Sequence, residues 1–379
     1  MAVAQPRRHL PYGRQAIDED DIAAVVEALR SDWLTTGPRV GWFEEAFAEV
    51  AGTAHAVALS SGTAALHALV HALGVGPGDE VIVPPMTFAA TANCILYTGA
   101  TPVFADVDPS TLLLDPVDAE RRITDRTRAI LAVDYAGQPC DWGLLRALAD
   151  DYGLALGADA CHSLGGDDHG RPVGSLADAS AFSLHPVKHV TTGEGGVVTT
   201  DDEELAARMR RFRNHGISTD HRERAEAGAW FYEMVELGFN YRITDFQCAL
   251  GLSQLGKLPG WVERRRALAA RYDAALAGLP AVRPLRRRQG AGHAFHLYVV
   301  RVPRRDEVFA ELRAAGIGAN VHYIPVHLHP YYRERLGTGP GLCPAAEDAF
   351  AEILSLPLFP GMSEADVDDV VASLAEAVE

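Results

Sequence analysis

The stretch Ser180-Ala-Phe-Ser-Leu-His-Pro-Val-Lys-His-Val-Thr-Thr-Gly-Glu-Gly-Gly196 places one lysine, Lys188, between an apolar run and a glycine-rich turn. The run 179–184 has the composition of a short buried strand, and Pro186 disfavours helix at the residue before it. No acidic residue lies within five positions of Lys188. A lysine on irregular backbone without a neighbouring carboxylate loses its proton more easily than a surface lysine, as an amine nucleophile must. For a lysine considered alone, an ordinary loop position is the simpler interpretation.

On both sides of this stretch, short apolar runs alternate with segments of helical spacing. The predicted strands are 55–59, 80–83, 102–105, 129–133, 154–157, 179–184 and 196–199, and the helices among them are 64–73, 87–97 and 141–152. This alternation predicts an α/β fold with a mostly parallel, doubly wound sheet. In such sheets, ligands bind beyond the carboxyl ends of the strands.

The pattern changes in the last third of the chain, where strands around 297–302 lie among helices predicted at 261–276, 306–315, 344–354 and 363–378. A chain of 379 residues fits two domains. We therefore expect a large domain over residues 1–250 and a smaller α+β C-terminal domain over residues 251–379.

Composition narrows the class of protein. The chain is 48% hydrophobic and 22% charged, as ordinary soluble globular proteins are, and its net charge of −17 excludes a basic nucleic-acid footprint. Residues 50–78 and 81–105 contain no charged side chain, but Gly, Pro, Ser, Thr and His interrupt them, which favours buried strands and helices over membrane spans. The five cysteines lack C-x-x-C spacing and indicate free thiols. With no apolar signal core near the first residues, we expect a cytoplasmic protein that binds neither nucleic acid nor membrane.

Two further polar segments follow predicted strands. Ser60-Ser-Gly-Thr63 lies between a strand and a helix, where free backbone N–H groups and hydroxyls can hold a phosphate. Simple N-capping is the alternative for this segment. Asp159 follows the strand 154–157 and, if buried, needs a cationic partner such as a protonated pyridine nitrogen. A capping or turn aspartate is the alternative there. All these groups, together with Lys188, are expected at one edge of the sheet.

Seven segments together resemble the pyridoxal-phosphate-dependent sugar aminotransferases, which install amino groups on nucleotide-linked keto sugars. The segments are 60–66, 78–88, 99–108, 159–162, 180–196, 213–216 and 238–242. The resemblance covers nearly the whole chain and implies the fold of type I aminotransferases. The pseudaminic acid pathway aminotransferases are the most similar subfamily, although Ala158 and His189 depart from the expected Glu and Pro.

The resemblance implies a role for each matching residue. Lys188 would form a Schiff base with pyridoxal 5'-phosphate and shuttle a proton, and Asp159 would pair with the pyridinium nitrogen. The other implied cofactor contacts are Gly62, Thr63 and Ser183 at the phosphate, Phe88 on the ring face, His162 by the phenolic oxygen, and Asn240 reaching the phosphate of the neighbouring subunit. His322 and Tyr323 would line the substrate pocket. Asn240 thus implies a homodimer with shared active sites.

The implied reaction moves an amino group from glutamate to a nucleotide-linked 4-keto-6-deoxy sugar. The subfamily resemblance points to UDP-4-amino-4,6-dideoxy-N-acetyl-altrosamine as product. The alternatives are an aminotransferase for another dTDP- or UDP-keto sugar, or a regulatory protein that binds pyridoxal phosphate. No metal is expected at His322-Tyr-Ile-Pro-Val-His-Leu-His329, because Asp, Glu and Cys ligands are missing nearby.

Overall fold

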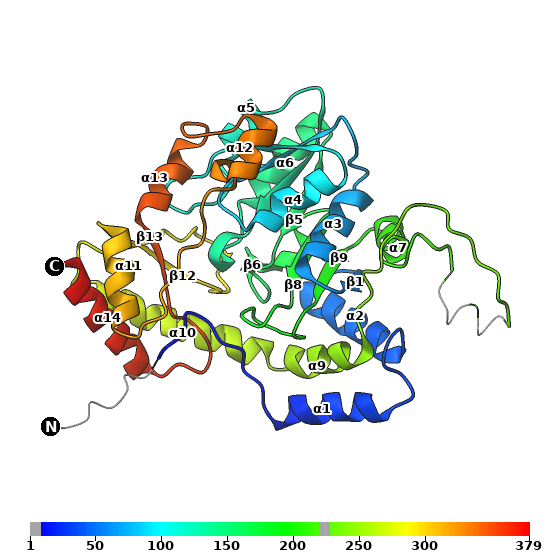
Figure 1. The fold of residues 1–379 in the computed structure, drawn as a ribbon, viewed down its shortest axis with the longest axis horizontal. Helices are drawn as coiled ribbons and strands as arrows, with labels where there is room; N and C mark the ends of the chain where they lie inside the picture. Colours follow the sequence, from blue (N-terminus) through cyan, green and yellow to red (C-terminus); the bar gives the residue numbers. More distant parts are fainter. Residues whose placement is uncertain (1–8, 220–223, 225–227) are drawn as a thin grey trace.

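A seven-stranded sheet forms the centre of the protein, as seen in a computed structural model that describes residues 9–219, 224 and 228–379 (Figure 1). The strand order is β1-β9-β8-β5-β4-β2-β3. These strands are β1 (His55–Leu59), β2 (Glu80–Val83), β3 (Thr101–Phe104), β4 (Thr127–Val133), β5 (Ala155–Asp159), β8 (Ala179–Ser183) and β9 (Gly196–Thr200). Only β9 runs against its neighbours β1 and β8; the pairs from β8 to β3 are parallel. The predicted α/β fold with a mostly parallel sheet is confirmed.

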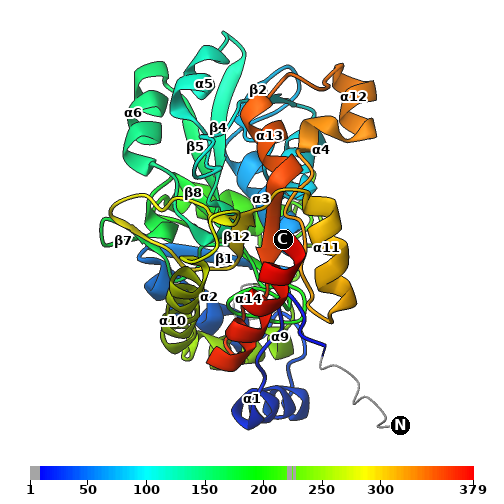
Figure 2. The same ribbon diagram turned by 90° about the vertical axis from the view of Figure 1, so that its left-hand side faces the viewer.

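Helices cover both faces of this sheet. The helices of the first two thirds are α1 (Glu19–Arg30), α2 (Pro38–Ala51), α3 (Gly62–Ala72), α4 (Ala89–Tyr97), α5 (Pro116–Arg121), α6 (Trp142–Tyr152), α7 (Glu203–Phe212) and α9 (Asp245–Leu255). In Figure 2, strands β4 and β5 lie between α5 and α6 on one side and α3 and α4 on the other. Both faces are therefore buried, which explains why the strands read as continuous apolar runs rather than alternating ones.

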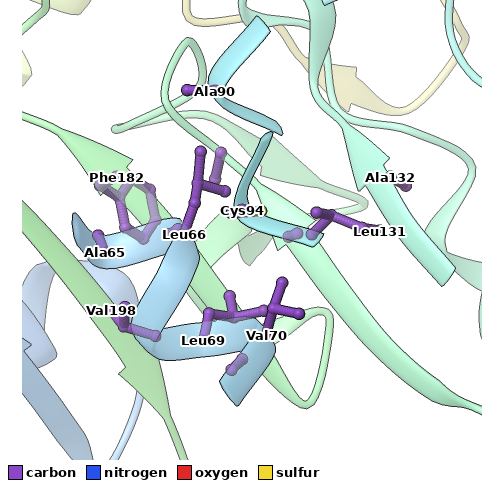
Figure 3. Packing of buried hydrophobic residues seen from close by; sticks show 14 of the residues in the cluster. Ala65, Leu66, Leu69, Val70, Ala90, Cys94, Leu131, Ala132, Phe182 and Val198 are labelled. Carbon is purple, nitrogen blue, oxygen red and sulfur yellow. The ribbon is translucent and has the colours of Figure 1, made fainter. Parts of the chain in front are cut away.

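Helix α3 is packed closely onto the sheet, and this helix later provides part of the site. Its buried side chains include Leu66 and Leu69, which lie near Phe182 of β8 and Val198 of β9 (Figure 3). A Cβ atom added at Gly157 of β5 would lie 3.0 Å from Leu69 Cδ2, so a glycine there lets the helix approach. Each such leucine contributes about 1.5–3 kcal/mol by burial, which holds the N-terminus of α3 in place.

A second, smaller layer follows α9. Its helices are α10 (Leu258–Leu276), α11 (Arg305–Ala314) and α14 (Glu364–Val378), and its antiparallel sheet is β10 (Arg283–Pro284), β12 (Tyr298–Arg301) and β13 (Ile353–Leu356) in that order. These elements share a hydrophobic cluster of their own, which Leu10 joins from the N-terminal side. A domain division at residue 250 stays a proposal, since this position lies within α9.

The short elements complete the chain. They are α12 (Pro330–Leu336), α13 (Pro344–Glu352), and the strands β6 (Asp167–Asp168), β7 (Arg171–Pro172) and β11 (Ala291–Gly292), which form a third sheet. The helix predicted over 344–354 ends at Glu352, and Ile353 begins β13. All four β13 residues are buried, and an apolar run of this length fits a strand as well as a helix. Pairing with β12 decides between the two.

Two segments each carry several of the exposed apolar side chains. Ile22, Leu29 and Trp33 lie on or just after α1, and they are 40–53% exposed. The second segment, residues 228–240, belongs to an extended arm that lies beyond α7 and leads back towards α9 (Figure 1); on it, Trp230 is 84% and Leu237 76% exposed. Within the described ranges, no helix is both long enough and apolar enough to cross a membrane.

Candidate active site

Strand ends bring the predicted residues to one edge of the sheet. Asp159 is the last residue of β5 and Ser183 the last of β8, while Gly62 begins α3 after β1. Because β9 is antiparallel, its first residue, Gly196, lies at the same edge as these strand ends. The edge is therefore assembled from four strands that are far apart in the sequence, as the parallel topology predicts.

The N-terminus of α3 and the end of β8 form a narrow cup. A Cβ atom at Gly62 would lie 2.8 Å from Ser183 Cβ, and one at Gly196 would lie 2.3 Å from the Ser61 carbonyl oxygen. Ser61 caps the helix by accepting a hydrogen bond of 3.1 Å from the Ala64 N–H. The first N–H groups of a helix have no intrahelical acceptor, so those of Gly62 and Thr63 can donate to an anion together with the Ser183 hydroxyl.

Asp159 is buried and fixed by two donors. Thr91 Oγ donates to its Oδ2 at 2.6 Å, and the Cys161 N–H donates to its Oδ1 at 3.1 Å. The hydroxyl of Thr87 lies 2.6 Å from that of Thr91. Asp159 is only 6% exposed, and it forms no ion pair with any side chain in the described part of the chain. A buried carboxylate in this state suits a protonated ring nitrogen.

Lys188 lies in the loop between β8 and β9, with its Nζ atom 3.4 Å from His296 Nε2. Burial lowers the pKa of Lys188 below its ordinary value, and nearby Cys161 and Asp159 oppose this effect only in part. The sequence contains one other lysine, Lys257. Lys257 Nζ forms an ion pair of 2.8 Å with Asp21. Lys188 is therefore the only ε-amine at this edge of the sheet.

Four buried histidines surround the lysine. The ring of His296 lies 4.4 Å from that of His162 and 5.8 Å from that of His189, measured between centroids. Burial lowers the pKa of each of these three well below 6.5, and Lys188 adds to the effect. For His322, burial and Lys188 lower the pKa to about 3. All four rings are therefore neutral at neutral pH.

The predicted substrate residues adjoin this group. Tyr323 Oη lies 3.1 Å from His162 Nε2, and His322 Nδ1 lies 2.9 Å from Ser355 Oγ. The ring of Phe88 is 61% exposed and lies 6.1 Å from that of Tyr323, so one aromatic face is free for stacking. The structure thus brings these predicted residues together around Lys188 and Asp159.

Asn240 is placed differently. It lies on the exposed arm, where its backbone pairs with that of Asn214. Its side chain makes no hydrogen bond to another described residue. This placement leaves its predicted contact to a neighbouring subunit as a proposal.

The histidines of the segment 322–329 go to separate partners. His327 Nε2 lies 2.9 Å from Glu347, whereas His322 bonds Ser355. Among the residues that the structure describes, no three His, Cys, Asp or Glu side chains gather as a metal site would need.

Three residues near the site were not predicted from the sequence. Thr91 holds Asp159, His296 contacts Lys188, and Tyr12 lies with its ring 5.2 Å from that of His322. Thr91 lies three residues after Phe88, a helical spacing that could have pointed to it. His296 and Tyr12 come from segments that meet the site only through the fold.

The fold, the strand-end lysine and the buried aspartate define a pyridoxal-phosphate-dependent aminotransferase. Residues 15–375 match the DegT/DnrJ/EryC1/StrS aminotransferase family, and the chain belongs to this family of sugar aminotransferases. Pyridoxal phosphate is the cofactor of this family. The family, the enzyme class and the cofactor predicted from the sequence are thus confirmed.

Individual relatives span the full chain. The spore coat polysaccharide biosynthesis protein SpsC of Bacillus subtilis is 43% identical over 387 residues, covering 100% of this chain and 99% of the relative. The putative sugar aminotransferase Spr1654 of Streptococcus pneumoniae, solved in its PMP form, has a TM-score of 0.93 at 34% identity, covering 98% and 100%. PseC of Helicobacter pylori, an aminotransferase involved in pseudoaminic acid biosynthesis, has a TM-score of 0.91 at 33% identity, covering 98% and 99%.

Proposed function

We propose that this sugar aminotransferase moves the amino group of glutamate to the keto carbon of a nucleotide-linked 4-keto-6-deoxy sugar, in the cytoplasm. The product we expect is UDP-4-amino-4,6-dideoxy-N-acetyl-altrosamine. The likeness to PseC over 98% of the chain supports this choice. An aminotransferase for another UDP- or dTDP-keto sugar is the alternative.

The observation that carries the proposal is the position of Lys188. Its amine lies at the strand-end edge together with Asp159, and the second lysine of the chain is engaged with Asp21 instead. The lowered pKa of Lys188 favours the neutral amine that attacks a carbonyl. A regulatory protein that only binds the cofactor has no need of this reactive arrangement.

The surrounding residues fit pyridoxal 5'-phosphate group by group. When bound, the cofactor supplies an aldehyde group that accepts the amino group from the donor, and a ring that withdraws electrons. Asp159, held by Thr91, would keep the ring nitrogen protonated. The phosphate would accept hydrogen bonds from Gly62, Thr63 and Ser183 in the cup, whose small residues leave room for it.

The remaining residues would orient the reacting groups. Phe88 would cover one face of the ring, and His162 would lie beside the phenolic oxygen. His322 and Tyr323 would contact the sugar. Lys188 would hold the cofactor covalently and, once released, move a proton between carbon atoms of cofactor and substrate. In the full cycle glutamate becomes 2-oxoglutarate while the keto sugar becomes an amino sugar.

We further propose a homodimer with two shared sites. The exposed apolar side chains of α1 and of the arm are more typical of an interface than of a free surface. In a dimer that buried the arm, Asn240 of each subunit could reach the cofactor phosphate bound in the other subunit.

The test of the lysine uses both ε-amines of the chain. Borohydride treatment of the cofactor-loaded enzyme should fix the cofactor on the peptide with Lys188. The Lys188→Ala variant should lose this label and all turnover, whereas Lys257→Ala should keep both. Near wild-type turnover in Lys188→Ala would contradict the proposal.

The test of the substrate uses a panel of UDP- and dTDP-linked 4-keto sugars with ¹⁵N-glutamate. We expect the highest kcat/KM, and ¹⁵N at C4 of the product, with the UDP-linked N-acetylated 4-keto-6-deoxy sugar. A higher kcat/KM for a dTDP-linked sugar would select the alternative substrate without affecting the assignment of the lysine.

A further inference from the structure

His296 is the one side chain that forms a hydrogen bond with the Lys188 amine within the described residues, at 3.4 Å from Nε2 to Nζ. Asp159 accepts its two hydrogen bonds from Thr91 and the Cys161 N–H, and none from the Lys188 amine. The Nε2 atoms of two other histidines of the group have partners elsewhere: His189 Nε2 lies 2.9 Å from the Ala294 carbonyl oxygen, and His162 Nε2 lies 3.1 Å from Tyr323 Oη. The Nδ1 atoms of His162, His189 and His296 are buried and have no hydrogen-bond partner among the described residues.

The segment that carries His296 is fixed on both sides. The Ala294 N–H donates to the Gly137 carbonyl at 2.8 Å, and the Leu297 N–H donates to the Ala136 carbonyl at 3.0 Å. Arg265 Nη1 adds a bond of 3.2 Å to the Phe295 carbonyl. His296 is 5% exposed, so its imidazole has little freedom to move away from the lysine.

A protonated lysine amine in this position needs an acceptor. A buried ammonium without a hydrogen-bond partner is costly, and a hydrogen bond from a charged donor is roughly twice as strong as one between neutral groups. The neutral His296 ring offers its Nε2 lone pair for this purpose, which places the imidazole proton on Nδ1.

We propose that His296 is a positioning residue: its Nε2 atom accepts a hydrogen bond from the Lys188 amine and holds the amine in place while the lysine carries a proton. The proposal rests on the proposed role of Lys188. It adds a residue that neither the sequence nor the family assignment provides, from a segment more than 100 positions away in the chain.

Two amide substitutions of His296 test whether the position of the acceptor atom matters, or only the polarity of the side chain. In His296→Gln, the amide oxygen can reach the place of Nε2, whereas in His296→Asn it reaches only the place of Nδ1. Both variants keep a polar side chain of smaller or similar volume. His189→Gln is the matched control, since its amide can still donate to Ala294 while the imidazole next to the lysine is removed.

The first measurement uses cofactor-free protein. Reductive methylation with formaldehyde and cyanoborohydride, followed by peptide mass spectrometry from pH 6 to 11, gives the apparent pKa of the Lys188 amine. With only two lysines in the chain, Lys257 serves as the internal reference. We expect the Lys188 pKa to fall by about half a unit to one unit in His296→Asn, because the ammonium loses its charge-assisted acceptor. His296→Gln and His189→Gln should stay within about 0.3 units of wild type.

The second measurement uses loaded enzyme and glutamate. His296→Asn should lower kcat about tenfold with little change in KM, and His296→Gln should recover most of the loss. An unchanged Lys188 pKa in folded His296→Asn, or an equal shift in His189→Gln, would overturn the proposal. If borohydride fails to label Lys188 in the wild type, the proposed function fails instead, so the two failures are distinguishable.

Discussion

Thr91 and the Cys161 N–H hold both oxygens of Asp159, which fixes where a positive charge can be placed beside the carboxylate. These two contacts show how a carboxylate can remain buried without an ion pair, through hydrogen bonds to a hydroxyl and a backbone amide.

Replacing Asp159 by Asn should therefore lower kcat by about two orders of magnitude or more, as the loss of a main electrostatic stabiliser does. Steady-state kinetics with glutamate and the preferred keto sugar checks this. The cofactor should still bind through the cup and Lys188, which its absorbance will show. A kcat equal to that of wild type would mean that Asp159 is only a structural residue.

The cup can be tested through Gly62. In Gly62→Ala the new methyl group would lie 2.8 Å from Ser183 Cβ. Because α3 or β8 must shift to relieve this clash, the cup would be distorted, and cofactor binding should weaken by about tenfold or more. Gly41→Ala is the control: this glycine lies within α2 with no atom within 4 Å of its added Cβ, so cofactor affinity should stay unchanged. Titration of cofactor-free protein by absorbance measures both. Equal affinities in all three proteins would refute the cup.

The sequence predicted individual site residues unevenly. Lys188 and Gly62 follow strands and Asp159 ends one, so topology alone places all three at one edge of the sheet. His296 and Tyr12 follow no such rule, because their positions depend on how the layer after α9 packs against the sheet. Their contacts join residues 108 and 310 positions apart, which no local pattern encodes.

At the level of elements, β4 leads into a buried hydrogen-bond network around Asp134, which lies next to the candidate site. Asp134 Oδ2 accepts a hydrogen bond from Ser163 Oγ at 2.7 Å, and its Oδ1 accepts from the Cys140 N–H and the Trp142 indole. Burial raises the pKa of Asp134 to about 7 although these three bonds lower it. Ser163 follows His162, so the network connects β4 to the segment after β5.

This network predicts a pH-dependent stability. The pKa of Asp134 in the folded protein lies above its ordinary value of 3.8. The contribution of Asp134 to the free energy of unfolding is therefore fully present below pH 3.8 and is lost as the pH rises towards 7. In Asp134→Asn this titration is removed. The Tm of wild type minus that of the variant should therefore fall from pH 5 to pH 8, measured by thermal unfolding. A difference that is constant with pH would contradict the assignment.

Strands and helices were predicted with unequal accuracy. The bounds of β1 and β2 match their predictions at both ends, because turn residues delimit both runs. The segment 353–354 was assigned to a helix and forms part of β13. Its apolar residues allow either structure, and only the partner strand β12 specifies extended backbone.

For the whole molecule, the proposed homodimer makes a quantitative prediction. Chains with Lys188→Ala and chains with Asn240→Ala should each be inactive alone. After unfolding, equal mixing and refolding, about half the dimers should be mixed, and each mixed dimer has one site with both defects and one sound site. Activity should thus return to roughly a quarter of wild type.

Native mass spectrometry provides the control for this experiment by counting the mixed dimers. If mixed dimers form and activity does not recover, Asn240 acts in its own chain and the shared-site arrangement is wrong. Exclusively monomeric protein would refute the dimer itself.

The position of β1 also sets an order for folding during synthesis. β1 is an edge strand whose one neighbour is β9, so His55 pairs with Thr200. Strands β2, β3, β4, β5 and β8 can pair among themselves as they leave the ribosome, but β1 has to wait for a partner made some 140 residues later. Nascent chains arrested before Gly196 should therefore be cut by protease around residues 52–62, and chains that have released Thr200 should resist. The phosphate cup, which needs α3 beside β8 and β9, would then be among the last parts of the sheet edge to form.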